Sequence, residues 1–356
     1  MLNVFTFMLL AVPMTWVAHH LGWSPLAVAG FASLGIIPVA KYMGEATENV
    51  SHKVGPSLGG LVSATFGNAC ELIIAIMAVR AGLIDVVKAS ITGSIIGNLL
   101  LVLGASMLFG GIKNDVQSFN RTTAGTAATV LTIVAVSLML PAALHHTAGG
   151  VTQLADTSMA IAISVVLIVL YIAGLVFSLR THRHLFTPVV TEDKASKEDE
   201  HAPGWSLGRS AAVLLGATLT VVFLSEYLVE SVEHASKTLG MTPVFVGVIL
   251  LAIIGNAAEN SSAILMARKN KMDLSINIVL GSSTQIAMFV APVVVFAGCI
   301  VGQPMDLVFS EAEILAVFSS VIVLTLVVND GKSHWLEGAY LLGLYMILGI
   351  CFYFIP

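Results

Sequence analysis

Two glutamates stand inside apolar stretches that are long enough to cross a lipid bilayer. Glu71 lies in FGNACE, within SLGGLVSATFGNACELIIAIMAV, and Glu259 lies in GNAAEN, within VGVILLAIIGNAAENSSAILMAR. An ionised carboxylate at the bilayer centre costs at least ~2.5 kcal/mol on insertion scales, so such a residue normally faces a cavity, a partner or an ion. The alternative is a protonated, structural glutamate that bonds a neighbouring helix.

The two glutamates occupy equivalent positions of an internal repeat. Each ends a GNAxE motif, and their numbers differ by 259 − 71 = 188 residues. At this offset ten of the 28 positions from Gly67 to Ser94 are identical, including the polar Arg80 and Asp85. Symmetry-related copies favour a shared binding site over two unrelated structural glutamates.

Side chains that carry oxygen accompany both glutamates. Asn68 and Asn256 each precede their glutamate by three residues and so share its helix face. The next apolar stretch of each half adds another pair at helical spacing; these pairs are Ser94 with Asn98 and Ser282 with Gln285. Carboxylate, amide, hydroxyl and carbonyl oxygens form a hard ligand set that suits Ca²⁺. Packing between helices is the alternative role of the serines and amides.

The elements that must position these residues are transmembrane helices. Of 356 residues, 57% are hydrophobic and 10% are charged, and the mean hydropathy is +0.93. Windows of about 20 residues, the length that spans a bilayer, predict an all-α polytopic membrane protein with about eleven spans. The predicted spans begin near Leu2, Pro25, Leu58, Asp85, Thr122, Thr157, Trp205, Pro243, Asp273, Phe309 and His334.

The predicted spans form one helix followed by two halves. Residues 1–22 hold the helix outside the repeat, 23–181 the first five-helix half and 205–356 the second. Residues 182–204 are rich in both charge signs and are expected to form a solvated cytoplasmic linker. Because five spans, an odd number, separate the motif copies, the repeats are expected to be inverted, as in many secondary transporters.

Basic residues predict the orientation of the chain, because cationic loops stay on the cytoplasmic side. With the N-terminus in the cytoplasm and the C-terminus on the opposite side, cytoplasmic loops hold 13 of the 16 Lys and Arg residues. The remaining three are Arg80, Lys88 and Lys237. The expected location is the plasma (inner) membrane if the source is prokaryotic. With a net charge of −5, no nucleic-acid partner is expected.

The doubled motif resembles that of the Ca²⁺/H⁺ exchangers, the CAX family of the cation/Ca²⁺ exchanger superfamily. GNACE and GNAAEN are each followed by Gly-Ser on the next predicted helix, and an acidic loop separates the sixth span from the seventh. The resemblance implies that both glutamates carry Ca²⁺ and protons. It also implies that Ser94, Asn98, Ser282 and Gln285 line the site. Some relatives have His where this chain has Asn260, so a titrating role is not carried over to that position.

The sequence therefore predicts a secondary active antiporter, not an enzyme, that exchanges cytosolic Ca²⁺ for protons by alternating access and needs no cofactor. A Na⁺/Ca²⁺ or Mn²⁺/H⁺ exchanger and, less favoured, a passive cation channel are the alternatives. An intramembrane hydrolase is disfavoured because no predicted apolar core holds two aspartates. The sequence leaves a homo-oligomer open.

Other polar residues have a structural explanation in the sequence. Four glutamates near the ends of the second and seventh spans are read as solvated, with a cation-entry or gating role left open by their repeat symmetry; they are Glu45, Glu48, Glu230 and Glu233. Ser310 and Glu313 have the spacing of a capping box. The pair His145–His146 is read as loose surface histidines.

Overall fold

The computed structural model describes residues 4–147, 152–182 and 204–354, and these residues are almost entirely helical. The first part contains α1 (Val4–Met8), α2 (Ala11–His20), α3 (Pro25–Val54), α4 (Pro56–Phe66), α5 (Ala69–Arg80), α6 (Ile84–Ile96), the π-helix η1 (Gly97–Val102), α7 (Leu103–Gly111), β1 (Gln117–Ser118), α8 (Arg121–Thr147), α9 (Gln153–Val176) and the π-helix η2 (Phe177–Thr181). The second contains α10 (Leu207–Leu239), α11 (Pro243–Phe245), η4 (Val246–Leu251), α12 (Ala252–Gly255), α13 (Ala257–Arg268), α14 (Met272–Gln285), η5 (Ile286–Val290), α15 (Ala291–Val301), α16 (Glu311–Val327), β2 (Lys332–Ser333) and α17 (Trp335–Phe354). Most of the predicted linker lies outside the described residues.

Length and apolar composition confirm a polytopic helical membrane protein. Seven helices of the described residues could cross a membrane, and up to nine if each of two bent helix pairs is one span. The other two predicted spans fall on shorter helices, namely α1 with α2 and α16. Pro13 lacks the N–H group that would bond the carbonyl of Leu9, which explains the break before α2. The count of eleven stays a prediction.

Local sequence sets several helix ends. Ser24 caps α3, because its side chain accepts a hydrogen bond from the backbone N–H of Ala27 at 3.3 Å. The predicted capping box of Ser310 and Glu313 at the start of α16 is confirmed. Gly240 ends α10 in the left-handed conformation, with φ = 65°.

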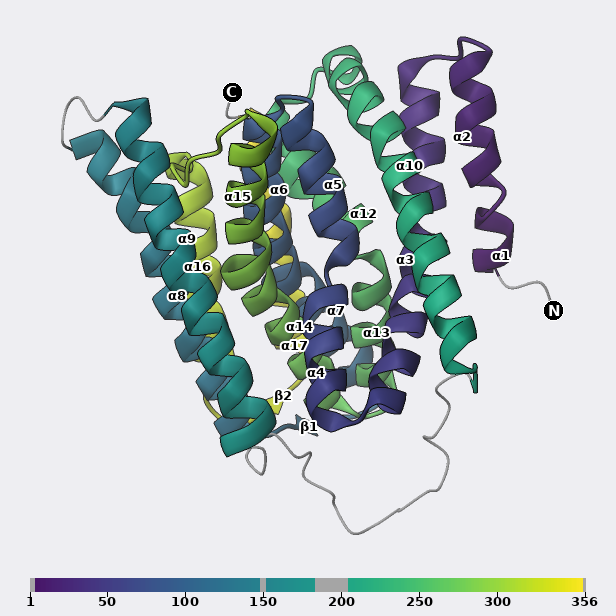
Figure 1. Ribbon diagram of the computed structural model, residues 1–356. Coiled ribbons are helices and arrows are strands. Elements are labelled where there is room, and N and C mark those ends of the chain that lie inside the picture. The colour runs from purple at the N-terminus through teal and green to yellow at the C-terminus, as the bar shows by residue number, and fades with distance from the viewer. Residues whose placement is uncertain (1–3, 148–151, 183–203, 355–356) are drawn as a thin grey trace.

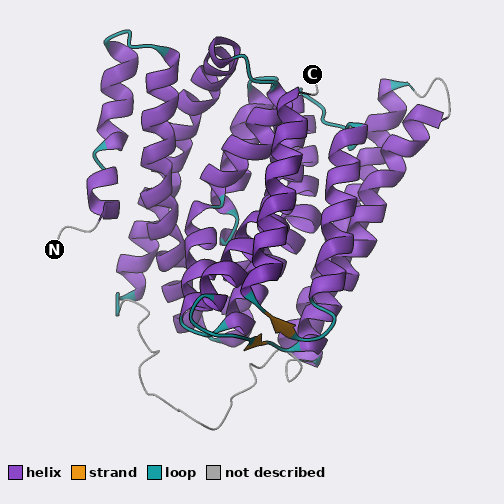
Figure 2. Cartoon of the chain, turned by 180° about the vertical axis from the view of Figure 1, so that it is seen from behind, coloured by secondary structure: helices purple, strands orange, loops and turns teal. Residues whose placement is uncertain are grey.

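The helices pack in two units, each with its own apolar core. One unit is built on α3 and α10, the two longest helices, which lie side by side next to α2 (Figure 1; Figure 2 from behind). The other contains α6 to α9 and α14 to α17. At the crossing of α6 with η4, a Cβ on Gly93 would lie 2.3 Å from the Cα of Val248. Only glycine allows this approach.

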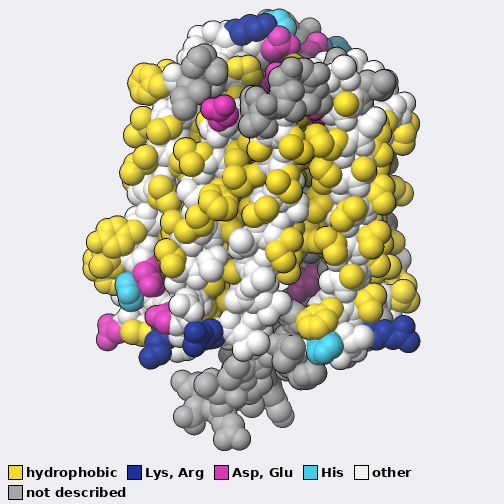
Figure 3. All heavy atoms as spheres, turned by 90° about the vertical axis from the view of Figure 1, so that its left-hand side faces the viewer, with side chains coloured by type: hydrophobic (Ala, Val, Ile, Leu, Met, Phe, Trp, Pro, Cys, Tyr) yellow, Lys and Arg dark blue, Asp and Glu magenta, His cyan; other side chains and the backbone are white. Residues whose placement is uncertain are grey.

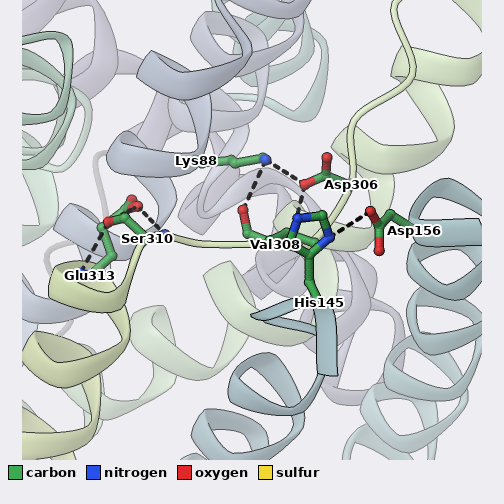
Figure 4. A network of polar contacts seen from close by, with 7 residues as sticks. All are labelled: Lys88, His145, Asp156, Asp306, Val308, Ser310 and Glu313. Carbon is green, nitrogen blue, oxygen red and sulfur yellow. Dashed lines mark hydrogen bonds and ion pairs between the residues drawn. The ribbon is translucent and has the colours of Figure 1, made fainter. Parts of the chain in front are cut away.

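The two ends of the bundle are fastened differently. At the lower end in Figure 1, β1 pairs antiparallel with β2, so that a loop of the first half meets one of the second. We call this the ribbon end. At the opposite end Lys88 of α6 forms an ion pair with Asp306 and donates to the carbonyl of Val308 at 3.0 Å (Figure 4).

Two more polar contacts reinforce the end opposite the ribbon. Thr92 donates to Glu313 at 2.9 Å, which joins α6 to α16. His145 of α8 bonds Asp156 of α9 at 2.8 Å, and Asp156 is buried (Figure 4). The interpretation of His145 as a loose surface histidine is therefore wrong. Its partner is eleven residues away on the next helix, a contact that residue spacing alone does not reveal.

Candidate ion-binding site

Each half contains a helix that is broken at the Gly-Asn of its motif. The helix axis bends by 42° between α4 and α5, and by 65° between α12 and α13. Asn68 and Asn256 are the N-cap residues of α5 and α13, so Glu71 and Glu259 lie in the first turns of these helices. Free backbone N–H groups and the helix dipole favour negative charge there.

The glutamate of each half packs against the break of the other half. A Cβ on Gly255 would lie 3.2 Å from Cγ of Glu71 and 3.6 Å from its Oε1. A Cβ on Gly67 would lie 3.6 Å from Oε1 of Glu259. The two carboxylates and the two breaks therefore meet in one place. Figure 1 shows α5 above α4 but α13 below α12, so the broken helices run past each other in opposite senses.

A chain of amide and hydroxyl groups connects the first break to the second half. Asn68 donates its Nδ2 hydrogen to Oε1 of Gln285, and its Oδ1 accepts from Ser282 at 3.0 Å. Asn98 donates to the same serine hydroxyl at 3.1 Å. The result is a continuous link from α5 through α14 to η1.

The second break has a smaller network. Asn256 donates to Oγ of Ser94 at 2.9 Å and to the carbonyl of Ala252 at 2.9 Å. With this contact, all eight residues that the sequence predicts for the site lie at or beside the two breaks. They are Glu71, Glu259, Asn68, Asn256, Ser94, Asn98, Ser282 and Gln285.

Four oxygens around the breaks are buried and have no hydrogen-bond partner. They are Oε2 of Glu71, Oε2 of Glu259, Oδ1 of Asn256 and Oδ1 of Asn260. An unpaired buried acceptor costs about 1–3 kcal/mol, and native proteins seldom leave several together without a reason. Acceptors contributed by both halves suit a bound cation or proton. The predicted set omitted Asn260, although its place directly after Glu259 was a signal.

The two glutamates are the acidic part of this site. The described residues contain no group of three or more His, Cys, Asp or Glu side chains that could hold a metal ion. The remaining oxygens come from amides and hydroxyls, which are neutral. The two positive charges of a divalent cation would therefore be neutralised when both carboxylates are ionised.

π-helical turns follow the site in both halves. η1 begins at Gly97 and contains Asn98, and η5 begins at Ile286, directly after Gln285. The repeat offset of 188 carries Asn98 to 98 + 188 = 286, so the two π-helical segments occupy equivalent positions. Such turns are frequent at functional sites.

Comparison with known proteins identifies the family. The sodium/calcium exchanger protein family matches residues 24–180 and 209–354. The chain belongs to the sodium/calcium exchanger protein family. The resemblance inferred from the doubled motif is confirmed. Residues 181–208, which include the predicted linker, lie between the two matched parts.

Known proteins are similar to this chain over nearly their whole length. A Ca(2+)/H(+) antiporter of Aphanothece halophytica is 45% identical over 366 residues, which cover 99% of this chain and 97% of the relative. The Ca(2+)/H(+) antiporter ChaA of Bacillus subtilis is 41% identical, with 99% of both chains covered. The solved structure of native YfkE superposes with a TM-score of 0.85 at 37% identity and covers 99% of this chain and 100% of that one.

Two of the four further glutamates that the sequence singles out have a lysine partner on their own helix. Glu45 lies 3.7 Å from Lys41, and Glu233 lies 2.7 Å from Lys237, each within one helical turn. Glu48 and Glu230 are exposed, on α3 and α10 respectively. A role in cation entry or gating stays a prediction for all four.

Proposed function

We propose that the chain is a secondary active antiporter that exchanges cytosolic Ca²⁺ for protons at the site between Glu71 and Glu259. The observation that carries the proposal is the meeting of two carboxylates from different halves, each with a buried oxygen that lacks a hydrogen-bond partner. The carboxylate, amide and hydroxyl oxygens of these residues suit Ca²⁺. The names of the relatives from Aphanothece halophytica and Bacillus subtilis support the same exchange.

Charge balance explains how the two fluxes are coupled. In the state open to the cytoplasm, both glutamates are ionised and Ca²⁺ neutralises them. In the state open to the other side, protons neutralise them and the ion leaves. Either neutral load can cross the apolar barrier, whereas the empty site with two negative charges cannot cross without a high cost. Return of the empty site, which would let one ion cross without exchange for the other, is thereby suppressed.

Alternating access requires that one group of helices moves against another around the site. The broken helices of the two halves run in opposite senses, which supports an inverted repeat. The unit of α3 and α10 has its own apolar core and is therefore the part that we expect to move as a body. We assign the N-terminus to the cytoplasm, the C-terminus to the other side and, if the source is prokaryotic, the chain to the plasma (inner) membrane.

Three alternatives are separated by the driving gradient and the transported ion. A Na⁺/Ca²⁺ exchanger would release Ca²⁺ from loaded vesicles when Na⁺ is the only gradient, and a Mn²⁺/H⁺ exchanger would prefer Mn²⁺ under a proton gradient. A passive channel would not move Ca²⁺ against its own gradient. Uphill Ca²⁺ flux on imposing a pH gradient, without Na⁺, is the result expected of the proposed exchanger.

Removal of either carboxylate tests the site itself. Glu71→Gln and Glu259→Gln should each abolish Ca²⁺/H⁺ exchange in reconstituted vesicles, because Gln keeps the volume but removes the charge that attracts Ca²⁺ and the group that takes up the proton. Both variants should still fold, because neutral Gln is cheaper to insert than ionised Glu. Glu311→Gln, at an exposed position of α16, is the matched control and should exchange normally. Exchange at the wild-type rate by either site variant would refute the assignment.

A further inference from the structure

A cavity of about 570 Å³ lies between α8, α9 and α14, away from the unit of α3 and α10. This is within the usual size range of ligand pockets. Its walls include Val130, Leu170, Gly174 and Leu280, and its inner wall includes Gln285. The cavity therefore extends from the outer helices to a residue of the ion-binding site.

Most of the lining of this cavity is apolar, with the amides of Asn277 and Gln285 as its main exceptions. Several of its hydroxyl groups are already hydrogen-bonded. Thr126, Ser137 and Thr284 each donate to a backbone carbonyl of their own helix at 2.8 Å. Their hydrogens are thus unavailable to an occupant. A molecule with many hydrogen-bonding groups would lose its bonds to water on entry, so the cavity favours a hydrocarbon occupant.

The outer side of the cavity faces the bilayer. Ile133 of α8 and Leu170 of α9 line it and are 55% and 44% exposed. Figure 3 shows this side of the molecule, with hydrophobic side chains across its middle and charged side chains towards its two ends. The opening of the cavity therefore faces the hydrocarbon core of the bilayer.

A basic residue, Arg180, lies near one end of the cavity. Phe177 and Ser178 of η2 line the cavity, and Arg180 follows two residues later in the same turn segment. Arg180 is exposed, and none of the described carboxylates pairs with it. Basic residues at the edge of a membrane span attract anionic lipid headgroups.

We infer that this cavity binds an acyl chain of an anionic phospholipid, with the lipid phosphate at Arg180. The bound chain packs between α8 and α9 and reaches the wall formed by Gln285. Gln285 accepts a hydrogen bond from Asn68, so the lipid excludes water from the back of the ion-binding network. The site thus links the surrounding membrane to the exchange machinery.

Filling the cavity tests the acyl-chain part of the inference. A Cβ on Gly174 would meet no atom within 4 Å, so Gly174→Phe projects a ring into the cavity, and Gly174→Leu is a smaller alternative if the first variant aggregates. Native mass spectrometry of detergent-purified protein with added dioleoyl phosphatidylglycerol should detect one retained lipid on the wild type and none on the filled variant. Gly216→Phe, at an equally open glycine on α10, should retain the lipid. Equal retention by the filled variant and the wild type would overturn the site.

The headgroup part is tested by charge. Arg180→Gln should lower retention of phosphatidylglycerol about fivefold and retention of phosphatidylcholine less, because the choline group offsets the charge of the phosphate. Arg268→Gln, an exposed arginine at the end of α13, is the control and should change neither. Sodium oleate serves as a phosphate-free probe with a single acyl chain, and its displacement of phosphatidylglycerol from the wild type would support a shared acyl-chain site. Equal binding of the two phospholipids, unaffected by Arg180→Gln, would refute the assigned anionic headgroup.

Discussion

The two asparagines of the repeated motif are used unequally. Both polar atoms of the Asn68 amide are hydrogen-bonded, to Gln285 and Ser282. Asn256 uses only its Nδ2 atom, and its Oδ1 atom is buried without a partner. Positions that are equivalent in sequence therefore differ in the free oxygen that they offer to a cation.

This difference predicts unequal mutant phenotypes. Asn256→Ala should weaken apparent Ca²⁺ affinity about tenfold, because it removes an oxygen that is free to bind the ion. Polar contacts to charged groups are worth about 1.5–3 kcal/mol. Asn68→Ala should weaken it less, by about fivefold, because Gln285 and Ser282 remain at the site. Titration of Ca²⁺ uptake by reconstituted vesicles measures both. The reverse order of the two effects would contradict the assignment of free oxygens.

Acid should compete with Ca²⁺ at the same carboxylates. Lowering the pH on the cytoplasmic side should raise the Ca²⁺ concentration needed for half-maximal transport and leave the maximal rate unchanged, because protonated glutamate loses its charge and most of its ligand strength. Uptake measured between about pH 5 and pH 8 tests this competition. An apparent affinity that does not change over this range would mean that protons bind elsewhere.

The residue pattern predicted which side chains form the candidate site, but it did not predict contacts between side chains that are distant in the sequence. The glutamates, asparagines and serines could be found because two copies of one motif repeat in the sequence. The pairing of Lys88 with Asp306 could not, because 218 residues separate them and neither belongs to a motif. Such contacts depend on how helices cross, which hydropathy does not encode.

At the scale of elements, hydropathy predicted where helices lie but not their irregular turns. The breaks between α4 and α5 and between α12 and α13 interrupt two of the predicted spans at the Gly-Asn of each motif. The π-helical turns η1 and η5 were not predicted. A window of apolar residues reads composition and cannot detect one additional residue in a turn.

The close crossing of α6 with η4 makes this element contact sensitive to side-chain size. Gly93→Ala should lower the thermal unfolding midpoint of the purified protein by the equivalent of about 1–3 kcal/mol, because the added methyl would overlap the backbone at Val248. Gly97→Ala is the matched control on the following turn, where a Cβ would meet no atom within 4 Å. Equal stability of the two variants would show that the crossing tolerates more room than its geometry indicates.

At the scale of the whole molecule, the inverted repeat predicts the sidedness of two arginines. Cysteines at positions 80 and 268, in a variant with Cys70, Cys299 and Cys351 replaced by serine, should react with a membrane-impermeant thiol reagent from opposite sides. A cysteine at Lys332, in β2, should react from the same side as that at position 268. Labelling of positions 80 and 268 from one side would exclude the inverted repeat.

The contacts that join the halves differ in chemistry at the two ends of the molecule. At the ribbon end β1 and β2 are joined by neutral backbone hydrogen bonds, whereas at the other end an ion pair, Lys88 with Asp306, holds α6 to the second half. The ion pair depends on two particular side chains, so a single substitution removes it, whereas the backbone ladder requires no particular side chain. The α6 helix that carries Lys88 also carries Ser94 of the candidate site. A sequence change at the end opposite the ribbon can therefore reach the site along α6, and substitutions should be tolerated more readily at the ribbon end.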